Sequence, residues 1–527
     1  MDNLASTYGN QGRWKEAELL VVQVMETRKR VLKEEHPDML HSMANLASTY
    51  GNQGRWKEAE LLEVQVTKTK RRVLGEEHLD TLDSMSSLAS TYGNQGRWKE
   101  AELLEVQVME TRKRVLGEEH PSTLISMSNL ASTYRNQGRW GEAELLFAQV
   151  METRKRVLGE EHPSTLISMA NLASSYGNQG RWKNAELLQV QVIETKKRVF
   201  GKEHPDTLIS IGNLASTYWN QGRLKEAELL QVQVIDTRKQ VLGEEHPDTM
   251  TSMDNLASTY RDQGRWKEAE LLEVQVLEKM RRVLGEEHPD TLTSMDNLAS
   301  TYWNQGRWKE AELLEVEVME KMKQVLGEEH PSTLTSMANL ASTYRSQGRG
   351  KEAELLQVQV IETKKRVFGE EHPSTLTSRG NLALAYWDQG RWKEAELLFV
   401  QVMGTRKRVL GEEHPSTLTS MANLASSYGT QGRWKEAELL EVQVMETRKR
   451  VLGEEHPSTL ISMSNLASTY RGQGRWKEAE LLFAQVMETR KRVLGEEHPD
   501  TLVSMDNLAS TYRNQERGRR RSCCLCR

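Results

Sequence analysis

The chain has 527 residues, with 71 lysines and arginines against 76 aspartates and glutamates, and a formal net charge of -5. Because both signs are interleaved throughout, no large electrostatic field favours nucleic acid or an anionic membrane, and we expect neither as a partner. No apolar run approaches the roughly 20 residues of a membrane span, and cysteine is absent before residue 523, which fits a reducing cytoplasm.

One motif recurs along the chain at a fixed spacing. The segment "NLASTYGNQGRWKEAELL" at residues 45–62 returns with few changes every 42 residues. Counted from the first residue of "NLA", twelve full units occupy residues 3–506, residues 1–2 begin a truncated unit, and residues 507–516 form part of a thirteenth. Such an unbroken repeat predicts an elongated array, in which each unit packs on its neighbours, in place of separate globular domains.

The unit around residue 423 predicts two helices. The first, helix A, has Pro415 in its first turn and Gly432 as a left-handed stop. Its apolar face consists of Leu418, Met421, Leu424, Ala425 and Tyr428. The second, helix B, ends before Gly453 and carries two apolar stripes, one of Trp434, Ala437, Leu440 and Val444 and the other of Leu439, Val442 and Met445. Two stripes predict that helix B is covered on two sides, by its own helix A and by the next one.

The pattern Leu424-Ala425-x-x-Tyr428, followed nine residues later by Ala437, resembles a tetratricopeptide repeat (TPR). The full unit is similar to the 42-residue TPR of kinesin light chains, and long runs of near-identical units resemble the C-terminal arrays of NB-ARC, NLR-like ATPases. This resemblance covers residues 3–516. It implies an all-α TPR α-solenoid, a right-handed superhelix of antiparallel helix pairs, and a non-enzymatic binder of proteins or peptides. No P-loop sequence of an ATPase is present.

Positions that differ between units are the candidates for ligand recognition. The seventh position is Gly, Arg or Trp, and helical geometry places it with the repeated Asn on the side of helix A away from the apolar stripe. In a TPR superhelix this side lines the concave groove, and the residue before "NLA", such as Asp254, Asp296 or Asp506, is expected on the same side. The variation at these positions is also compatible with drift at a tolerant surface.

The resemblance implies that A-helix asparagines hydrogen-bond the backbone of an extended peptide. On that basis the peptide-binding residues are Asn129, Asn171, Asn213, Asn255, Asn297, Asn339, Asn381, Asn423 and Asn465. At the seventh position, the specificity residues that could pair with acidic ligand groups are Arg135, Arg261, Arg345 and Arg471. Those that could serve as aromatic anchors are Trp219, Trp303 and Trp387.

Three further motifs suggest sites, and each has a structural interpretation that we prefer. The "EEHP" loops offer histidine and carboxylates, but without metal-ligand spacing they are more simply residues at the start of a helix. The "TRKR" runs match the helix dipole and need no nucleic acid. Residues 517–527 contain Cys523, Cys524 and Cys526, yet residues 518–527 follow from reading the codons of a repeat one base late, which indicates a frameshifted repeat. We expect no catalytic residue, metal or cofactor.

Two units break the framework. Gly350 replaces the helix-B tryptophan, and Arg379 replaces a helix-A methionine about one repeat later, so the joint around residues 350–380 is expected to open first. Leu224 in place of Trp and Leu79 in place of Pro should be milder changes.

The sequence therefore predicts a cytoplasmic scaffold that binds peptide segments or protein surfaces, in particular the recognition array of an NLR-like sensor. The alternatives are a kinesin-light-chain-like cargo adaptor and a non-functional fragment of a longer repeat gene. Neither the ligand nor the oligomeric state follows from the sequence.

Overall fold

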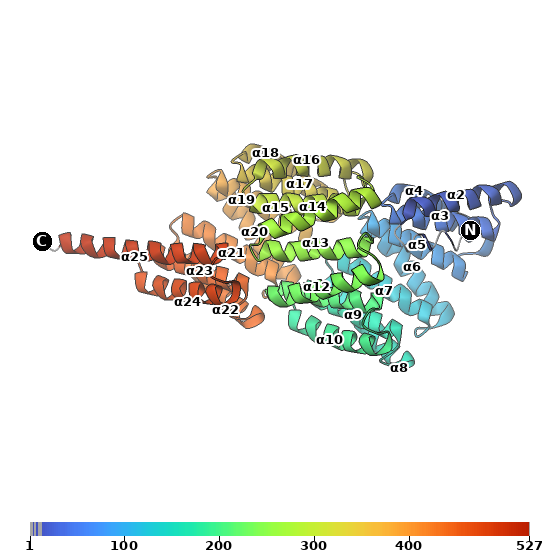
Figure 1. The fold of residues 1–527 in the computed structure, drawn as a ribbon, viewed down its shortest axis with the longest axis horizontal. Coiled ribbons are helices and arrows are strands. Elements are labelled where there is room, and N and C mark those ends of the chain that lie inside the picture. Colours follow the sequence, from blue (N-terminus) through green and yellow to red (C-terminus); the bar gives the residue numbers. More distant parts are fainter. Residues whose placement is uncertain (1–3, 5–6, 9–12, 526–527) are drawn as a thin grey trace.

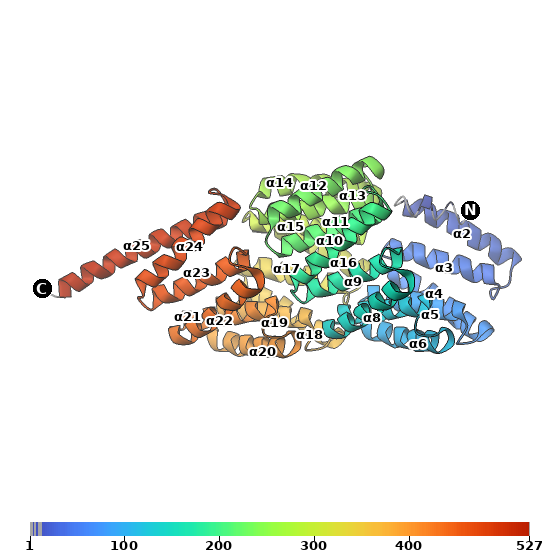
Figure 2. The ribbon, with the colours of Figure 1, turned by 90° about the horizontal axis from the view of Figure 1, so that it is seen from below.

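The computed structural model describes residue 4, residues 7–8 and residues 13–525, with side chains described up to residue 515. In this part of the chain helices follow one another with no strand (Figures 1 and 2). The A helices are α3 (Pro37–Asn52), α5 (Leu79–Asn94), α7 (Pro121–Asn136), α9 (Pro163–Asn178), α11 (Pro205–Asn220), α13 (Pro247–Asp262), α15 (Pro289–Asn304), α17 (Pro331–Ser346), α19 (Pro373–Asp388), α21 (Pro415–Thr430), α23 (Pro457–Gly472) and α25 (Pro499–Leu525). The B helices are α2 (Trp14–Val31), α4 (Trp56–Leu74), α6 (Trp98–Leu116), α8 (Trp140–Leu158), α10 (Trp182–Val199), α12 (Leu224–Val241), α14 (Trp266–Val283), α16 (Trp308–Val325), α18 (Gly350–Val367), α20 (Trp392–Leu410), α22 (Trp434–Leu452) and α24 (Trp476–Leu494).

Helix A begins with a histidine cap and a proline. In α21 the backbone N–H of Ser416 donates to Nδ1 of His414 at 3.1 Å, which satisfies one donor of the first turn, and Pro415 is the first helical residue. At the other end Gly432 has a φ of 74°, the left-handed conformation that ends a helix. Helix α22 stops before Gly453, whose φ is 103°, so the bounds predicted for both helices are confirmed.

The predicted apolar faces form a continuous core. The apolar residues of one unit that are at most 5% exposed are Leu418, Met421, Leu424, Ala425, Ala437 and Val444. Helix α22 contacts both α21 and α23, so helix B is covered on two sides as predicted. The assignment of Leu439 to a buried stripe was wrong, because this side chain is 73% exposed on the side of helix B that neither A helix covers.

The polar side chains of the "NQGR" segment join each repeat to the preceding one. The Nε2 atom of Gln137 donates to the backbone oxygen of Trp98 at 3.1 Å and to Glu102 at 2.8 Å. Arg139 donates to the same Glu102 at 2.7 Å, and its guanidinium lies 3.9 Å from the ring centroid of Tyr134, a cation–π distance. Equivalent contacts recur from the first described repeats to the last. These side chains are therefore used by the framework and are not available to a ligand.

Successive turns of the superhelix touch along a line that we call the seam. The Nε2 atom of His372 lies 3.1 Å from the carbonyl oxygen of Asn136, 236 residues earlier. The same contact joins His288, His330, His414 and His456 to the carbonyl oxygens of Asn52, Asn94, Asn178 and Asn220. One turn of the superhelix therefore takes between five and six repeats.

Close packing along the seam depends on glycine and on aromatic rings. A Cβ atom on Gly138 would lie 2.5 Å from Cδ of Pro373, so a larger residue would push the two turns apart. Trp98 stacks on Phe368 and His372, with ring centroids 4.7 and 5.2 Å apart. The histidines at the starts of the A helices thus have a second structural role that the sequence did not indicate.

At the C-terminal end α25 continues without a break through the partial thirteenth unit to Leu525 and projects away from the other helices (Figure 1). The side chains of Cys523, Cys524 and Cys526 lie outside the described residues, so the interpretation of residues 517–527 as a frameshifted repeat stays a prediction. No helix in the described part is both long enough and apolar enough to cross a bilayer.

Candidate functional site

The A helices form the inner wall of the superhelix. Consecutive A helices contact one another, as α13 does with α15, α17 with α19 and α21 with α23, whereas B helices pack mainly on the A helices beside them. An array whose A helices lie closest together curves with those helices on the inside. We call the surface between consecutive A helices, on this inner side, the groove.

The nine asparagines predicted to bind peptide are exposed or half-buried. Asn213 and Asn255 are exposed, and the other seven are half-buried. Nδ2 of Asn129 donates to Oγ of Ser86 at 3.2 Å, so this amide is already partly used by its neighbour. Asn213 lines a groove cavity, where its side chain can reach a ligand.

The four arginines predicted as specificity residues all contact other residues of the chain. Arg135 donates to Oγ of Ser174 at 3.2 Å, and Arg345 lies 3.4 Å from a carboxylate oxygen of Asp388. Arg471 lies over the ring of Phe483, 5.5 Å from its centroid.

Arg261 is the most constrained of the four. Its Nη1 atom lies 3.5 Å from Oε1 of Glu273 and donates to the backbone oxygen of Asn297 at 3.1 Å. An acidic ligand group would have to compete with these internal partners.

The three tryptophans at the seventh position differ in how much ring surface they present. Trp219 and Trp303 are 39% and 37% exposed, and Nε1 of Trp303 donates to Oγ of Ser346 at 3.1 Å. Trp387 packs against the core around Phe399, and its Nε1 has no hydrogen-bond partner among the described residues. Trp219 and Trp303 are therefore the better-placed candidate anchors.

Beneath the seventh position lies a second variable residue, which the sequence analysis missed. It is buried or half-buried on helix B, twelve residues after the seventh position, and it is Glu, Gln, Phe or Val. In chain order these floor residues are Val21, Glu63, Glu105, Phe147, Gln189, Gln231, Glu273, Glu315, Gln357, Phe399, Glu441 and Phe483. The signal was available, because an apolar helix stripe that carries Glu or Gln in some copies and Phe in others marks a special environment.

Where the seventh position is glycine, two cavities open in the groove. One, of 430 Å³, is lined by Gly51 and Trp56 and reaches the floor residue Glu63. The other, of 460 Å³, is lined by Gly177 and reaches the floor residue Gln189. A side chain at the seventh position, as in the arginine and tryptophan repeats, lies above the same floor.

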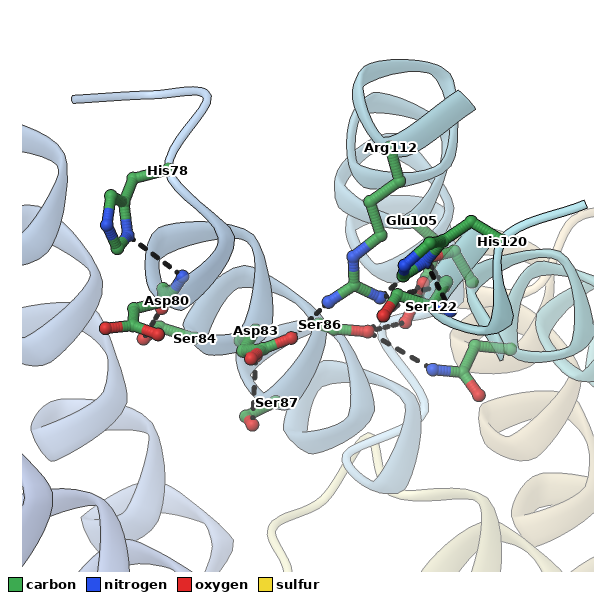
Figure 3. A network of polar contacts seen from close by, with 12 residues as sticks. His78, Asp80, Asp83, Ser84, Ser86, Ser87, Glu105, Arg112, His120 and Ser122 are labelled. Atoms are coloured by element: carbon green, nitrogen blue, oxygen red, sulfur yellow. Dashed lines mark hydrogen bonds and ion pairs between the residues drawn. The ribbon is translucent and has the colours of Figure 1, made fainter. Parts of the chain in front are cut away.

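The floor glutamates have unusual proton affinities. Burial raises the pKa of Glu105 to about 7. The hydroxyl of Ser86 donates to Oε1 of Glu105 at 3.1 Å (Figure 3), and this hydrogen bond lowers the pKa but offsets only part of the effect of burial. Burial likewise raises the pKa of Glu273, Glu315 and Glu441 to about 7. Removing these carboxyls from water disfavours their charged form.

Two aspartates predicted to face the groove lie deeper than expected. Asp254 is only 7% exposed, and its Oδ1 accepts a hydrogen bond from Ser294 at 3.2 Å. Burial raises the pKa of Asp254 and of Asp296 to about 7. The expectation that Asp254 is open to the groove was wrong, because the residue before "NLA" turns into the contact between consecutive A helices. Asp506 is exposed.

The "EEHP" histidines stand at the starts of A helices, as predicted. Nδ1 of His78 accepts the backbone N–H of Asp80 at 3.1 Å, and the ring of His120 does the same for Ser122 (Figure 3). Within the residues that the structure describes, no three His, Cys, Asp or Glu side chains gather in an arrangement that could hold a metal ion.

Comparison with known proteins identifies the repeat. The family model of the tetratricopeptide repeat matches twelve adjoining segments, from residues 1–38 through 459–500. Among solved structures, the nearly identical TPR-like repeats of a candidate kinesin light chain from Podosopora anserina, and a point variant of them, are 35% identical to this chain. Each match covers 38% of this chain and has a TM-score of 0.34. It includes 94% of the unmodified protein and 93% of the variant. BtubC from P. vanneervenii is 19% identical, covers 44% of this chain and 92% of its own, and has a TM-score of 0.37. The comparison with curated proteins gave no significant match.

Proposed function

Because this chain belongs to the tetratricopeptide repeat family, we propose that it is a non-enzymatic scaffold whose groove binds an extended segment of another protein. The observation that carries the proposal is the row of polar and aromatic side chains along consecutive A helices, interrupted by cavities at Gly51 and Gly177. A ligand backbone could be hydrogen-bonded by exposed amides, while its side chains enter the cavities.

Two features of the groove support this assignment. The amides of Asn213 and Asn255 are exposed, and each can donate to a carbonyl and accept from an N–H of an extended chain. Trp219 and Trp303 keep more than a third of their surface exposed, and such partly exposed rings are typical anchors at protein interfaces. The framework residues of "NQGR" are occupied internally and do not enter the proposal.

The test uses the full chain and an array of degenerate nonapeptides. We expect retention of a distinct subset of sequences, and about a thirtyfold loss of affinity for the double variant Asn213→Ala, Asn255→Ala, since two lost hydrogen bonds to a ligand contribute about 1 kcal/mol each.

The matched control is Leu229→Ala, which removes a 70% exposed side chain from helix α12 of the same repeat as Asn213. It should bind like the unmodified chain. Absence of any retained peptide, or equal losses in both variants, would argue against the groove as the binding surface.

For the wider context, we propose that the array is the recognition part of an NLR-like sensor. A cargo adaptor of the kinesin-light-chain type is the alternative. The genomic locus and its transcript separate them, since a P-loop ATPase in the same reading frame supports the sensor and a heptad coiled coil supports the adaptor.

A further inference from the structure

The cavity at Gly51 has a carboxylate at its base. Glu63 from helix α4 lines this cavity together with Ala47 and Ser48 of α3 and Ser90 of α5. The Oε2 atom of Glu63 is shielded from solvent and makes no hydrogen bond of normal geometry among the described residues, although the nearby hydroxyl of Thr91 stabilises the carboxylate. A buried carboxylate oxygen without a well-placed donor is costly, because its lost hydration is not replaced.

Repeat seven fills the equivalent place with an arginine of the chain itself. Glu273 occupies the same position in α14 as Glu63 does in α4, and Arg261 occupies the position of Gly51. At Gly51 the ring of Trp56 lies 2.8 Å from where a Cβ atom would be, so the ligand side chain must enter beside this ring. The guanidinium of Arg261 lies 3.5 Å from the Glu273 carboxylate and is half-buried. The fold therefore accommodates a guanidinium directly above this floor glutamate.

From this pair of repeats we propose that the Gly51 cavity receives a cationic side chain, arginine in preference to lysine, from the segment bound in the groove. The ligand side chain would take the place that Arg261 takes over Glu273, and its N–H groups would satisfy Oε2 of Glu63. This inference rests on the proposed function, since it names one side chain of the peptide that the groove binds.

The other charged groups around the cavity are compatible with a cation. Asp83 of α5 lines the same cavity, but it is ion-paired with Arg112, so the carboxylate that remains for a ligand cation is Glu63. Lys70 also lines it, but its Nζ donates to the backbone oxygen of Asp80 at 3.2 Å, which holds this ammonium at the start of α5. Arginine is favoured over lysine because its planar group can donate two parallel hydrogen bonds to one carboxylate.

The same combination of residues recurs twice. Glycine stands over a floor glutamate at Gly93 with Glu105 and at Gly429 with Glu441, and Oε2 of Glu441 likewise makes no hydrogen bond of normal geometry among the described residues. Gly177 stands over Gln189, which supplies a neutral cavity of similar size for comparison.

The proposal is tested first with the degenerate nonapeptides, synthesised with arginine, citrulline, lysine or glutamate fixed at the central position. We expect about a tenfold preference for arginine over citrulline, its neutral isostere, since a charge-assisted hydrogen bond is roughly twice as strong as a neutral one. The triple variant Glu63→Gln, Glu105→Gln, Glu441→Gln should lose this preference while still binding peptides. Glutamine stands naturally at this position as Gln189, Gln231 and Gln357, so the variant should fold.

Two outcomes of this experiment separate the inference from the proposed function. Peptide binding without an arginine preference would overturn the cation site and leave the groove function intact. If no peptide binds, the groove function fails, and the site is then tested with a small probe.

That probe is methylguanidinium, compared with neutral methylurea by saturation-transfer NMR on the full chain. We expect a methylguanidinium signal that falls in the triple glutamine variant and rises in Arg261→Gly, which removes the internal guanidinium over Glu273. Equal signals for the two probes, or signals unchanged by the variants, would overturn the proposal.

Discussion

The Nε2 atom of His330 lies 2.7 Å from the carbonyl oxygen of Asn94, while Nδ1 of the same ring accepts the backbone N–H of Ser332 at 3.1 Å. Because Nδ1 accepts, the proton of the neutral ring must be on Nε2, which then donates across the seam. One neutral imidazole thus caps a helix and joins two turns. A proton added to Nδ1 would abolish the cap.

We expect the superhelix to lengthen when the pH falls from 7.5 to 5. Burial lowers the pKa of His330, His372 and His414 below the ordinary value of 6.5. The folded chain therefore binds fewer protons than the unfolded chain just below pH 6.5, and the seam contribution to stability is lost as the pH decreases through that range. Small-angle X-ray scattering would record the change as an increase in the maximum dimension.

The histidine His120 provides a matched control for this prediction. It caps α7 through Nδ1 as His330 caps α17, but its ring has no cross-turn hydrogen bond among the described residues. Substitution His330→Ala should lengthen the particle at pH 7.5, whereas His120→Ala should destabilise one helix start without changing the maximum dimension. Equal dimensions for the two variants would contradict a role of the seam.

A tryptophan introduced at Leu224 should tighten the seam. Trp98 stacks on His372, and Trp140 stacks on His414 with ring centroids 5.0 Å apart. Leu224 stands at the corresponding place below His498, where a cavity of 1020 Å³ separates the two turns.

We expect Leu224→Trp to stabilise this contact by ~1 kcal/mol, the usual contribution of a ring pair. The variant should raise the thermal midpoint and shorten the maximum dimension. Leu229→Ala on the outer surface is the control, and a lower midpoint for Leu224→Trp would show that the cavity rejects the ring.

Replacing Asp254 and Asp296 should stabilise the array above neutral pH. The pKa of Asp254 and of Asp296 is about 7 against an ordinary value of 3.8. The folded state therefore binds more protons than the unfolded state between these values, and stability decreases as the pH rises towards 7. Ala338 and Ala422 occupy the same position in other repeats, so alanine fits.

For the double variant Asp254→Ala, Asp296→Ala we expect a gain on the order of 2 kcal/mol at pH 8 and almost none at pH 4. This gain in stability is measured by hydrogen exchange of α13 and α15, corrected for the intrinsic exchange rate at each pH. A gain of equal size at both pH values would point to packing as the cause.

The two helices of each unit and most of their cores could be predicted from the sequence, because Pro415, Gly432 and the spacing from Leu418 to Val444 depend on local geometry alone. Leu439 could not be placed correctly, since its exposure depends on the angle at which the neighbouring A helices approach. The seam could not be predicted from the sequence either, because it joins residues 236 positions apart. Their proximity depends on the accumulated curvature of several repeats.

The candidate site was predictable in part. The 42-residue period located the A-helix positions that form the groove, but it does not show how deeply each side chain is buried. Asp254 and the exposed Asn255 are adjacent in the chain, yet only the first is buried between helices. The floor residues were missed because Glu63 and Glu105 lie on the core side of helix B, where a carboxylate is not expected.

A buried lysine in α18 should weaken its repeat, and removing its charge should strengthen it. Lys364 is 4% exposed, and its Nζ donates to Oγ of Ser378 at 3.0 Å. Burial lowers the pKa of Lys364 to about 8 from 10.5, so the unfolded chain binds the extra proton and stability rises with pH between these values.

Met322 stands at the same position two helices earlier, so a methionine fits here. We expect Lys364→Met to stabilise the chain by about 1 to 2 kcal/mol at pH 7. This is less than the free energy that corresponds to the full pKa shift, because Ser378 loses its hydrogen-bond partner. The neighbouring Lys365→Met, whose side chain is 56% exposed, should change little. Stability that still rises from pH 8 to 10 in Lys364→Met would exclude this lysine as the cause.

The joint at residues 350–380 should be the first part of the array to open. Gly350 leaves the start of α18 without its indole, and Gln389 moves in so that its Cγ lies 2.9 Å from where a Cβ would be. Arg379 is half-buried on a face where Met421 is 5% exposed, and it donates to Gln401 at 2.7 Å. One hydrogen bond does not replace the apolar contacts of a buried methionine.

Since the stability of a solenoid is approximately a sum of contacts between neighbouring repeats, a weak joint lowers protection on both sides of it. We expect hydrogen exchange to be fastest in α18 and α19 among the interior helices. The double variant Gly350→Trp, Arg379→Met should slow it by a factor of ten or more, since each substitution restores about 1 kcal/mol or more of burial. Gln389 can yield to the new ring, because Gln347 and Trp308 coexist in the preceding repeat with an intact hydrogen bond of 3.1 Å. Uniform protection from α11 to α23 would mean that Gln389 and Gln401 already compensate for both substitutions.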